Sequence, residues 1–194
     1  MSAPPELSSV DEATLIRSVA EGNAAAYREL VRRHASRLLR LSSRLLRDAS
    51  EAEDVTQETF LRVWQRAADY SPDGSALGWL YRIAHNLCID RMRRRGKLDA
   101  FEEEELEAAP GSAPQSGLLN QMQRKSALER AIETLPQRQA AAITLVHLDE
   151  LSGHEAAQIM GVSAEALESL LSRARRNLKA RLASTLGPPA GEHS

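Results

Sequence analysis

The sequence predicts an all-α protein built from two small helical domains that are joined by a flexible linker. Apolar residues recur at three- and four-residue spacing through most of the chain, as they do on the buried face of a helix. Aromatic residues make up only 4% of the 194 residues, and no segment has the regular alternation of a convincing strand. Between residues 98 and 120 the helical spacing is replaced by acidic and Pro-, Gly- and Ser-containing sequence, which separates the two helical parts.

The predicted organisation has five parts. They are a flexible N-terminal tail (1–10), a helical domain (11–97), an acidic flexible linker (98–122), a helix-turn-helix domain (123–185) and a C-terminal tail (186–194). The segment 98–120 contains six acids and no Lys or Arg, so its charge is −6. Because the whole chain has a net charge of −2, the rest of the chain carries +4. Like charges repel, and Pro, Gly and Ser resist regular structure, so the linker is predicted to be flexible.

Four helices are predicted in the first domain, each with a recognisable start. The start signals are, in order, a capping box at residues 9–12, a break at Gly22-Asn23, a second capping box at residues 50–53, and Ser75 after a turn at residues 70–74. The second of these helices is long and amphipathic, with arginines opposite its leucines. The domain is therefore predicted to be a small helical bundle.

The fourth helix has one apolar side and one side suited to nucleic acid. The apolar band consists of Leu77, Leu80, Tyr81, Ala84, Leu87 and Cys88. A different side carries Trp79, Arg82, Asn86, Asp90 and Arg93. Bases stack on aromatic rings with about 1–3 kcal/mol each while arginines hold phosphates, so this side predicts binding of an unpaired strand. Trp79 is equally compatible with a place in the core, and both interpretations stay open.

The basic residues that end this helix favour the same interpretation. Five cations lie between residues 91 and 97, with few acidic neighbours in the sequence to neutralise them. The third helix has the opposite sign. Its residues Asp54 and Glu58 lie one turn apart with Gln57 beside them, and two like charges at that spacing repel. An external cationic partner would offset that repulsion.

The second domain ends in a helix-turn-helix pattern. Ser152 and Glu155 form a capping box for a short helix that ends at Gly161, and a longer helix begins near Ser163. The packing stripe of the longer helix consists of Val162, Leu167, Leu170, Leu171, Ala174 and Leu178. Its other faces carry Arg173, Arg175, Arg176, Lys179 and Arg181. Such a helix can enter a major groove and contact phosphates.

These segments resemble two conserved regions of bacterial RNA polymerase sigma factors of the extracytoplasmic-function (ECF, group IV) family. "DASEAEDVTQETFLRVWQRA" and "GSALGWLYRIAHNLCIDRMRRR" resemble sigma region 2, whereas "LPQRQAAAITLVHLDELSGHEAAQIMGVSAEALESLLSRARRNLKARL" resembles sigma region 4. The three segments make up a little under half of the chain and follow one another in the expected order. The resemblance implies a region 2 bundle, a variable linker and a region 4 helix-turn-helix.

The resemblance also implies three functional surfaces. Core polymerase, through its beta-prime clamp coiled coil, would be bound by Asp54, Gln57, Glu58 and Arg62. The minus-ten element would be bound by Tyr70, Ser75, Trp79, Arg82, Asn86, Arg93 and Arg94. The minus-thirty-five element would be bound by Ser163, Glu165, Glu168, Ser169, Ser172, Arg173, Arg175 and Arg176. Further expectations are contact with the polymerase beta flap, control by an anti-sigma factor and a role in a stress response.

One departure from the family pattern concerns the last helix. Family members often carry Lys or Arg where this chain has Glu168 and Leu170. Fewer cations weaken the sequence-independent attraction to phosphates. A glutamate in the groove can still accept a hydrogen bond from a cytosine amino group.

Two other classes of function are compatible with parts of the sequence. A free-standing repressor or activator would use the helix-turn-helix alone, and the acidic third helix argues against it. A metal-dependent protein would use Cys88 with His85, although the other histidines lack ligand spacing. No catalytic centre, cofactor or metal is predicted. With one cysteine, no export signal and no spanning segment, the chain is expected to be cytoplasmic without membrane insertion.

Overall fold

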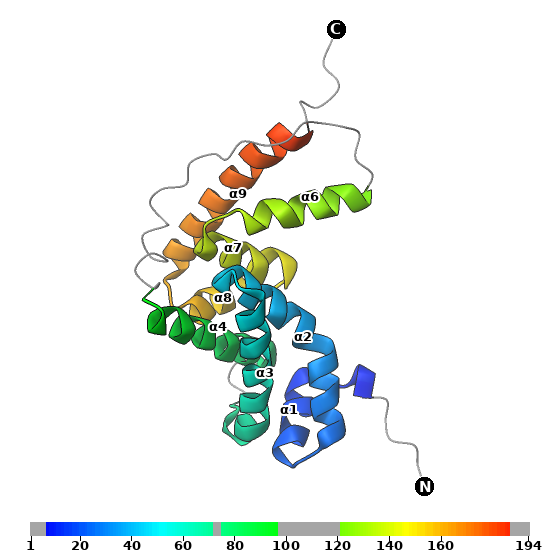
Figure 1. The fold of residues 1–194 in the computed structure, drawn as a ribbon. Coiled ribbons are helices and arrows are strands. Elements are labelled where there is room, and N and C mark those ends of the chain that lie inside the picture. Colours follow the sequence, from blue (N-terminus) through cyan, green and yellow to red (C-terminus); the bar gives the residue numbers. More distant parts are fainter. Residues whose placement is uncertain (1–6, 72–74, 97–120, 187–194) are drawn as a thin grey trace.

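The computed structural model describes residues 7–71, 75–96 and 121–186. Throughout these residues the regular structure is helical, as predicted, and it forms two groups of helices stacked one above the other (Figure 1). Most of the predicted linker, residues 98–120, lies outside the described residues.

The first group is a bundle around its longest helix. Its elements are η1 (Leu7–Ser9), α1 (Glu12–Ala20), α2 (Ala24–Leu46), α3 (Ala49–Arg66), η2 (Ala67–Asp69) and α4 (Ala76–Arg94). Helix α2 packs against α1, α3 and α4. Its leucines Leu30, Leu38, Leu41 and Leu45 are fully buried, which is the core face that the apolar spacing predicts.

Two helix starts differ from the expected capping boxes. Asp11 rather than Ser9 caps α1, because its carboxylate accepts the Thr14 N–H at 3.0 Å. Asp48 rather than Ser50 caps α3 through the Glu51 N–H. In both cases a carboxylate takes the position next to the positive end of the helix, where a negative charge is stabilised.

The start of the chain also differs from the loose tail that was expected through residue 10. Residues Leu7–Ser9 form the short 3-10 helix η1, and Leu7 and Val10 pack against the core. The Arg33 guanidinium of α2 holds this segment, donating to the Leu7 carbonyl at 2.6 Å and to the Val10 carbonyl at 2.7 Å. Composition alone did not reveal this long-range anchor.

The second group contains the predicted helix-turn-helix. Its elements are α6 (Gln121–Glu133), α7 (Gln137–Ile143), the π-helical turn η3 (Thr144–Leu148), α8 (Gly153–Met160) and α9 (Ala164–Leu186). The predicted capping box of Ser152 and Glu155 is present at the start of α8. Gly161 ends α8 at a φ of 66°, in the left-handed region that glycine adopts without steric cost.

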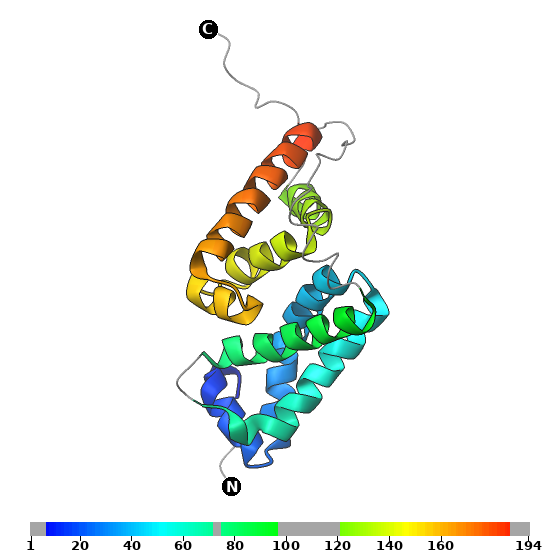
Figure 2. The same ribbon diagram turned by 90° about the vertical axis from the view of Figure 1, so that its left-hand side faces the viewer.

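The two groups are packed against each other as well as joined along the chain. Helix α4 packs on α8 and α2 packs on α7, while the buried apolar residues of both groups form one cluster. Figure 2 shows α8 lying directly above α4. Nothing in the sequence predicted this contact. No described helix is long and apolar enough to cross a membrane.

Candidate functional site

The nucleic-acid side of α4 is organised around its first turn. The Ser75 hydroxyl accepts the Gly78 N–H at 3.1 Å and caps the helix, as predicted. Trp79 is half-buried and packs beside Tyr70, with 5.6 Å between the ring centroids. Trp79 therefore contacts the core while part of its side chain stays exposed, and its role in base stacking stays a prediction. The opposite side of α4 is in the core, where Cys88 is fully buried.

Four of the predicted minus-ten residues meet in one pocket of about 440 Å³. Tyr70, Ser75, Trp79 and Arg82 all line it. Asn86 is exposed one turn further along α4, on the same face as Arg82. The remaining two are near the end of α4: Arg93 pairs with Asp90 at 3.2 Å, and Arg94 lines a separate pocket with Glu58 and Arg62.

The same 440 Å³ pocket includes three residues that sequence reasoning missed. Glu155, Gln158 and Ile159 of α8 form its other wall. The Arg82 guanidinium lies 3.4 Å from the Gln158 amide oxygen. These residues belong to the second helical group, so no local pattern around α4 could have indicated them.

The acidic side chains of α3 already have cationic partners within the molecule. Glu58 accepts from Arg62 at 2.9 Å, and Asp54 lies 3.7 Å from Arg91 of α4. The repulsion between these acids is therefore offset within the molecule as well, by Arg91 of α4 and by Arg62 in the next turn. Asp54 and Gln57 are nevertheless exposed and available to a partner.

The positive charge at the basic end of α4 is also neutralised more than its neighbours in the sequence suggested. Arg91 lies 3.8 Å from Glu51, and Arg95 pairs with both Glu51 and Asp48 of α3. Acids distant in sequence thus neutralise two of the five cations. Arg93 and Arg94 are exposed, although Arg93 also pairs with Asp90.

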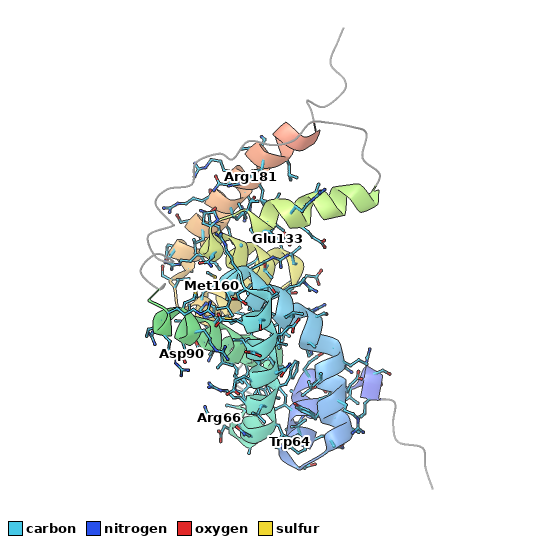
Figure 3. The ribbon with its side chains drawn as sticks, viewed as in Figure 1. Trp64, Arg66, Asp90, Glu133, Met160 and Arg181 are labelled. Carbon is cyan, nitrogen blue, oxygen red and sulfur yellow. The ribbon has the colours of Figure 1, made fainter. Side chains whose placement is uncertain are left out.

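Two large apolar side chains of α3 are exposed and were not predicted as functional. Leu61 is 48% exposed and Trp64 is 39% exposed. Leu61 lies one turn beyond Gln57 and Glu58, so it extends the surface that begins at Asp54. Trp64 lies near the far end of α3 (Figure 3). Its ring and that of Tyr27 pack in a T-shaped arrangement, with 5.2 Å between the ring centroids. The sequence could have indicated Leu61 as a contact residue, because its position in α3 does not fall on the face that the buried residues of this helix share.

Helix α9 presents most of the predicted minus-thirty-five residues to solvent. Ser163 caps the helix by accepting the Ala166 N–H. Glu165, Glu168, Ser172, Arg175 and Arg176 are exposed, while Ser169 and Arg173 are half-buried. Hydrogen bonds from its own backbone N–H and from Ser163 lower the pKa of Glu165. Leu170 is fully buried, so this departure from the family pattern serves the core rather than the exposed face.

The contact between the two groups buries a set of charged residues that the sequence did not single out. Asp149, directly after η3, is 2% exposed and accepts from Arg40 of α2 at 3.2 Å. Burial and the Asp149 carboxylate raise the pKa of Tyr81 on α4. Arg44 is 8% exposed, and its Nε and Nη1 atoms have no hydrogen-bond acceptor among the described residues.

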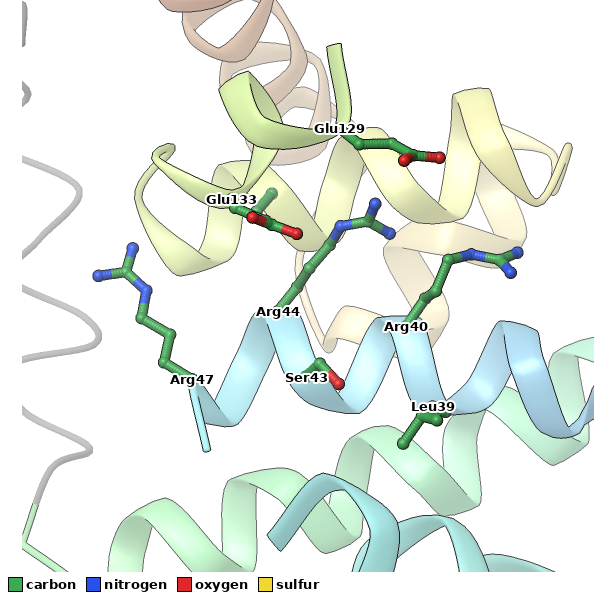
Figure 4. A pocket seen from close by; sticks show the side chains of 8 residues that line it. Leu39, Arg40, Ser43, Arg44, Arg47, Glu129 and Glu133 are labelled. Carbon is green, nitrogen blue, oxygen red and sulfur yellow. The ribbon is translucent and has the colours of Figure 1, made fainter. Parts of the chain in front are cut away.

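A pocket of about 540 Å³ lies beside this charged contact. Figure 4 shows Arg40 and Arg44 rising from α2 on the side of Glu129 and Glu133 of α6, whereas Arg47, just after α2, points away from them. Burial, together with the charge of Arg40, lowers the pKa of Arg44. At the end of α2 the Arg47 guanidinium donates to the Leu135 carbonyl at 2.7 Å, and Gln137 donates back to the Leu45 carbonyl at 2.8 Å.

The two residues of the metal hypothesis, His85 and Cys88, are both buried. Burial lowers the pKa of His85 to about 4 and raises that of Cys88 to about 12, so His85 is neutral and Cys88 is a thiol at neutral pH. Among the described residues, no three His, Cys, Asp or Glu side chains are grouped so that they could hold a metal ion. Cys88 is accounted for as a buried small residue.

Comparison with known families and proteins matches both helical groups. The family described as Sigma-70 region 2 matches residues 30–98, and the family described as Sigma-70, region 4 matches residues 125–178. The ECF RNA polymerase sigma factor SigM of Mycobacterium tuberculosis is 31% identical over 176 residues, which cover 91% of this chain and 85% of that protein. The chain belongs to the ECF sigma factors of RNA polymerase.

Further relatives of this sigma factor agree with that assignment. The ECF sigma factor SigE of Mycolicibacterium smegmatis is 38% identical over 170 residues, which make up 84% of this chain but 65% of that longer relative. Among solved structures, CnrH in complex with the cytosolic domain of CnrY matches with a TM-score of 0.60 and 26% identity, over 87% of this chain and 95% of that one. The sigma factor RpoE of Bartonella quintana, solved with the anti-sigma factor NepR, shares the fold with a TM-score of 0.58 and 22% identity over 79% of this chain and 94% of that one.

Proposed function

We propose that this sigma factor binds core RNA polymerase in the cytoplasm, directs it to specific promoters and melts the minus-ten element by capturing unpaired bases. The observation that carries the proposal is the exposed side of α4. There a half-buried pair of aromatic rings, Tyr70 and Trp79, lies beside Arg82, and Asn86 follows one turn later. Rings held at one edge and free at the other are suited to stacking an unpaired base, while arginines steady its phosphates.

The division of tasks among the other surfaces follows from their charge. Asp54, Glu58 and Leu61 of α3, together with Gln57 and Arg62, form the surface proposed for the beta-prime clamp. Arg175 and Arg176 of α9 are exposed, and we propose that they bind the phosphates of a minus-thirty-five duplex. We propose the beta flap as a second polymerase contact for the region 4 domain. We propose that the region 2 domain spans residues 11–97 and the region 4 domain residues 123–185.

Regulation by an inhibitory protein is part of the same proposal. Both relatives of known structure cited above were solved in complex with a second protein, and one of these partners is an anti-sigma factor. We propose that an anti-sigma factor covers the polymerase-binding and DNA-binding surfaces of this chain until a stress signal releases it. Co-purification from the native cell with and without stress tests this, and a sigma factor that stays unbound in both conditions contradicts it.

Run-off transcription with purified core polymerase tests the central function. We expect transcripts from a subset of genomic promoter fragments only when the chain is added. Trp79→Ala should reduce opening of the minus-ten element by about tenfold or more, since stacking on one ring contributes about 1–3 kcal/mol, whereas Trp79→Phe should retain most of it. Permanganate reactivity of unpaired thymines measures the opening. A complete absence of transcripts from all fragments would refute the proposal.

Polymerase binding separates this function from that of a free-standing repressor. The double change Asp54→Lys with Glu58→Lys reverses two charges on the proposed clamp surface and should weaken polymerase binding by at least about tenfold, as opposed charges across an interface do. Glu53→Lys makes the same kind of change at an exposed position of the same helix and is the control. Equal binding by both variants contradicts the assignment of this surface.

A further inference from the structure

The first turns of the proposed minus-ten surface, around Trp79 and Arg82, face this chain's own region 4 domain. Helix α8 packs on α4, and Glu155, Gln158 and Ile159 face Trp79 and Arg82 across one pocket. The Arg82 guanidinium donates a hydrogen bond to the Gln158 amide oxygen at 3.4 Å. The residues proposed to hold a strand are therefore in contact with protein.

Charge makes this covering incompatible with a bound strand. The Glu155 carboxylate lies beside the Ser75 hydroxyl, and hydrogen bonds from Ser152 first and then from Ser75 lower its pKa. Glu155 is thus an anion at neutral pH in the pocket where the phosphates of a strand would have to run. The Glu155 carboxylate and a phosphate in the same pocket would repel each other strongly, because the pocket partly shields both charges from water. The strand and α8 consequently exclude each other.

We call the contact surface between the two domains, where α4 packs on α8 and α2 on α7, the seam. A charged contact at its α2 side helps to hold the domains together. Asp149 of the region 4 domain is buried against Arg40, with Tyr81 and Arg44 of the region 2 domain around it. Glu129 and Glu133 extend the negative side of this contact towards the arginines of α2 (Figure 4). Asp149 is the only one of these carboxylates that is buried among the described residues.

The same contact is built so that it can be released. Two nitrogen atoms of Arg44 are buried without an acceptor in the described part of the chain, which costs free energy that water would recover on opening. A buried ion pair gains little over its hydrated ions because desolvation offsets the attraction. The charged part of the docking contact therefore separates at low net cost, unlike the apolar cluster that adjoins it.

We propose that the region 4 domain docks reversibly on the minus-ten surface, with Asp149 as its latch, and that docking and promoter strand compete for Trp79 and Arg82. The free chain is then closed to promoter DNA, and opening is required for the minus-ten surface to act. This inference rests on the proposed function only for the identity of the competing ligand. The closed contact and its release by changes at Asp149 can be measured without DNA.

The test uses the full chain and a pair of matched variants. Asp149→Arg places a cation against Arg40 and Arg44 and should open the seam. Glu150→Arg makes the same charge change at the next, exposed residue and is the control for general attraction to DNA. Arg40→Ala removes the hydrogen-bonded partner of Asp149 from the other side of the seam. Circular dichroism establishes that each variant keeps its helices.

Two readouts distinguish opening from strand binding. Dyes at the exposed positions Gln65→Cys on α3 and Ala180→Cys on α9 report the distance between the domains. Fluorescence anisotropy reports binding of a single-stranded minus-ten oligonucleotide, taken from a mapped promoter of this factor, in the absence of polymerase. We expect Asp149→Arg and Arg40→Ala to change the energy transfer and to bind the strand at least about tenfold more tightly than Glu150→Arg or the parent, because the competent fraction rises.

Each outcome decides a separate point. Unchanged energy transfer in both opened variants would overturn the latch. Altered energy transfer with unchanged strand affinity would overturn the competition, while run-off transcription that depends on Trp79 would still uphold the proposed function. If no run-off transcript forms with any variant, the proposed function fails although the energy-transfer result stands.

Discussion

Individual residues of this sigma factor owe their properties to burial more than to their own chemistry. His85 illustrates this, because it lies in α4 where the sequence offers it beside Cys88 as a candidate metal ligand. The fold instead buries it to 5% exposure and brings Arg138 of α7 near it. Both effects disfavour the protonated imidazole, so the pKa falls from 6.5 to about 4.

His85 should therefore make the stability of the protein depend on pH. The unfolded chain takes up a proton near pH 6.5, but the folded chain does not until about pH 4. The contribution of neutral His85 is fully present above pH 6.5 and is lost as the pH falls towards 4, by about 3 kcal/mol in total. His85→Leu should flatten this dependence in urea unfolding between these pH values. Parallel curves for both proteins would contradict the assignment, with buried His34 supplying the remaining slope in each.

At the scale of elements, short polar signals decide where the DNA-binding helices begin and end. Helix α8 has only eight residues, so its capping box and its terminal Gly161 set its limits on both sides. In the capping box the Ser152 hydroxyl accepts the Glu155 N–H at 3.2 Å, and the Glu155 carboxylate accepts the Ser152 N–H at 3.0 Å. Because α8 contacts both α9 and α4, this cap supports the helix-turn-helix and the domain contact together.

Loss of the α8 cap should destabilise the region 4 domain measurably. Ser152→Ala removes the hydroxyl acceptor and should cost about 1 kcal/mol, which corresponds to a decrease of about 2–4 °C in the melting temperature of a protein of this size. Ser152→Thr keeps a hydroxyl at the same place and should melt close to the parent. Thermal unfolding followed by circular dichroism measures both. Equal melting of the alanine and threonine variants would show that the cap contributes nothing.

The exposed face of α9 should respond to a single charge reversal. Glu168 is exposed among the proposed minus-thirty-five residues, so Glu168→Lys should tighten binding to duplex DNA and steepen the dependence of log K on log salt by about one unit. Glu21→Lys carries the same charge change on the exposed end of α1 and is the control. Titrations of a minus-thirty-five duplex at several salt concentrations measure the slope. An identical slope for both variants would place Glu168 away from the DNA.

At the scale of the whole molecule, the two domains form one body in spite of their separate families. The apolar cluster runs through both, and the charged contact around Asp149 adjoins it. Such coupling means that a change at the seam affects both domains. The minus-ten surface is then controlled by a residue more than fifty positions away along the chain, on a helix turn that has no DNA-binding role in the proposed function.

Calorimetry should reveal this coupling. We expect the parent to unfold in one cooperative transition because each domain stabilises the other. Asp149→Ala leaves Arg40 and Arg44 without their buried carboxylate, and removal of one partner of a buried pair is strongly destabilising. The variant should therefore unfold in two separated transitions. A single transition in Asp149→Ala, shifted no more than in the exposed control Glu150→Ala, would exclude strong coupling.

The sequence by itself determined the helical class, the helix-turn-helix with its cap at Ser152, the placement of Cys88 in the core and the family. These follow from apolar periodicity and short-range hydrogen bonds, which depend on residues only a few positions apart. The tertiary structure alone decided that Asp54 and Arg91 pair, that Arg33 anchors the first residues, and that α8 covers α4. Such contacts join residues that are distant along the chain, and their energies depend on burial and orientation, which no local pattern encodes.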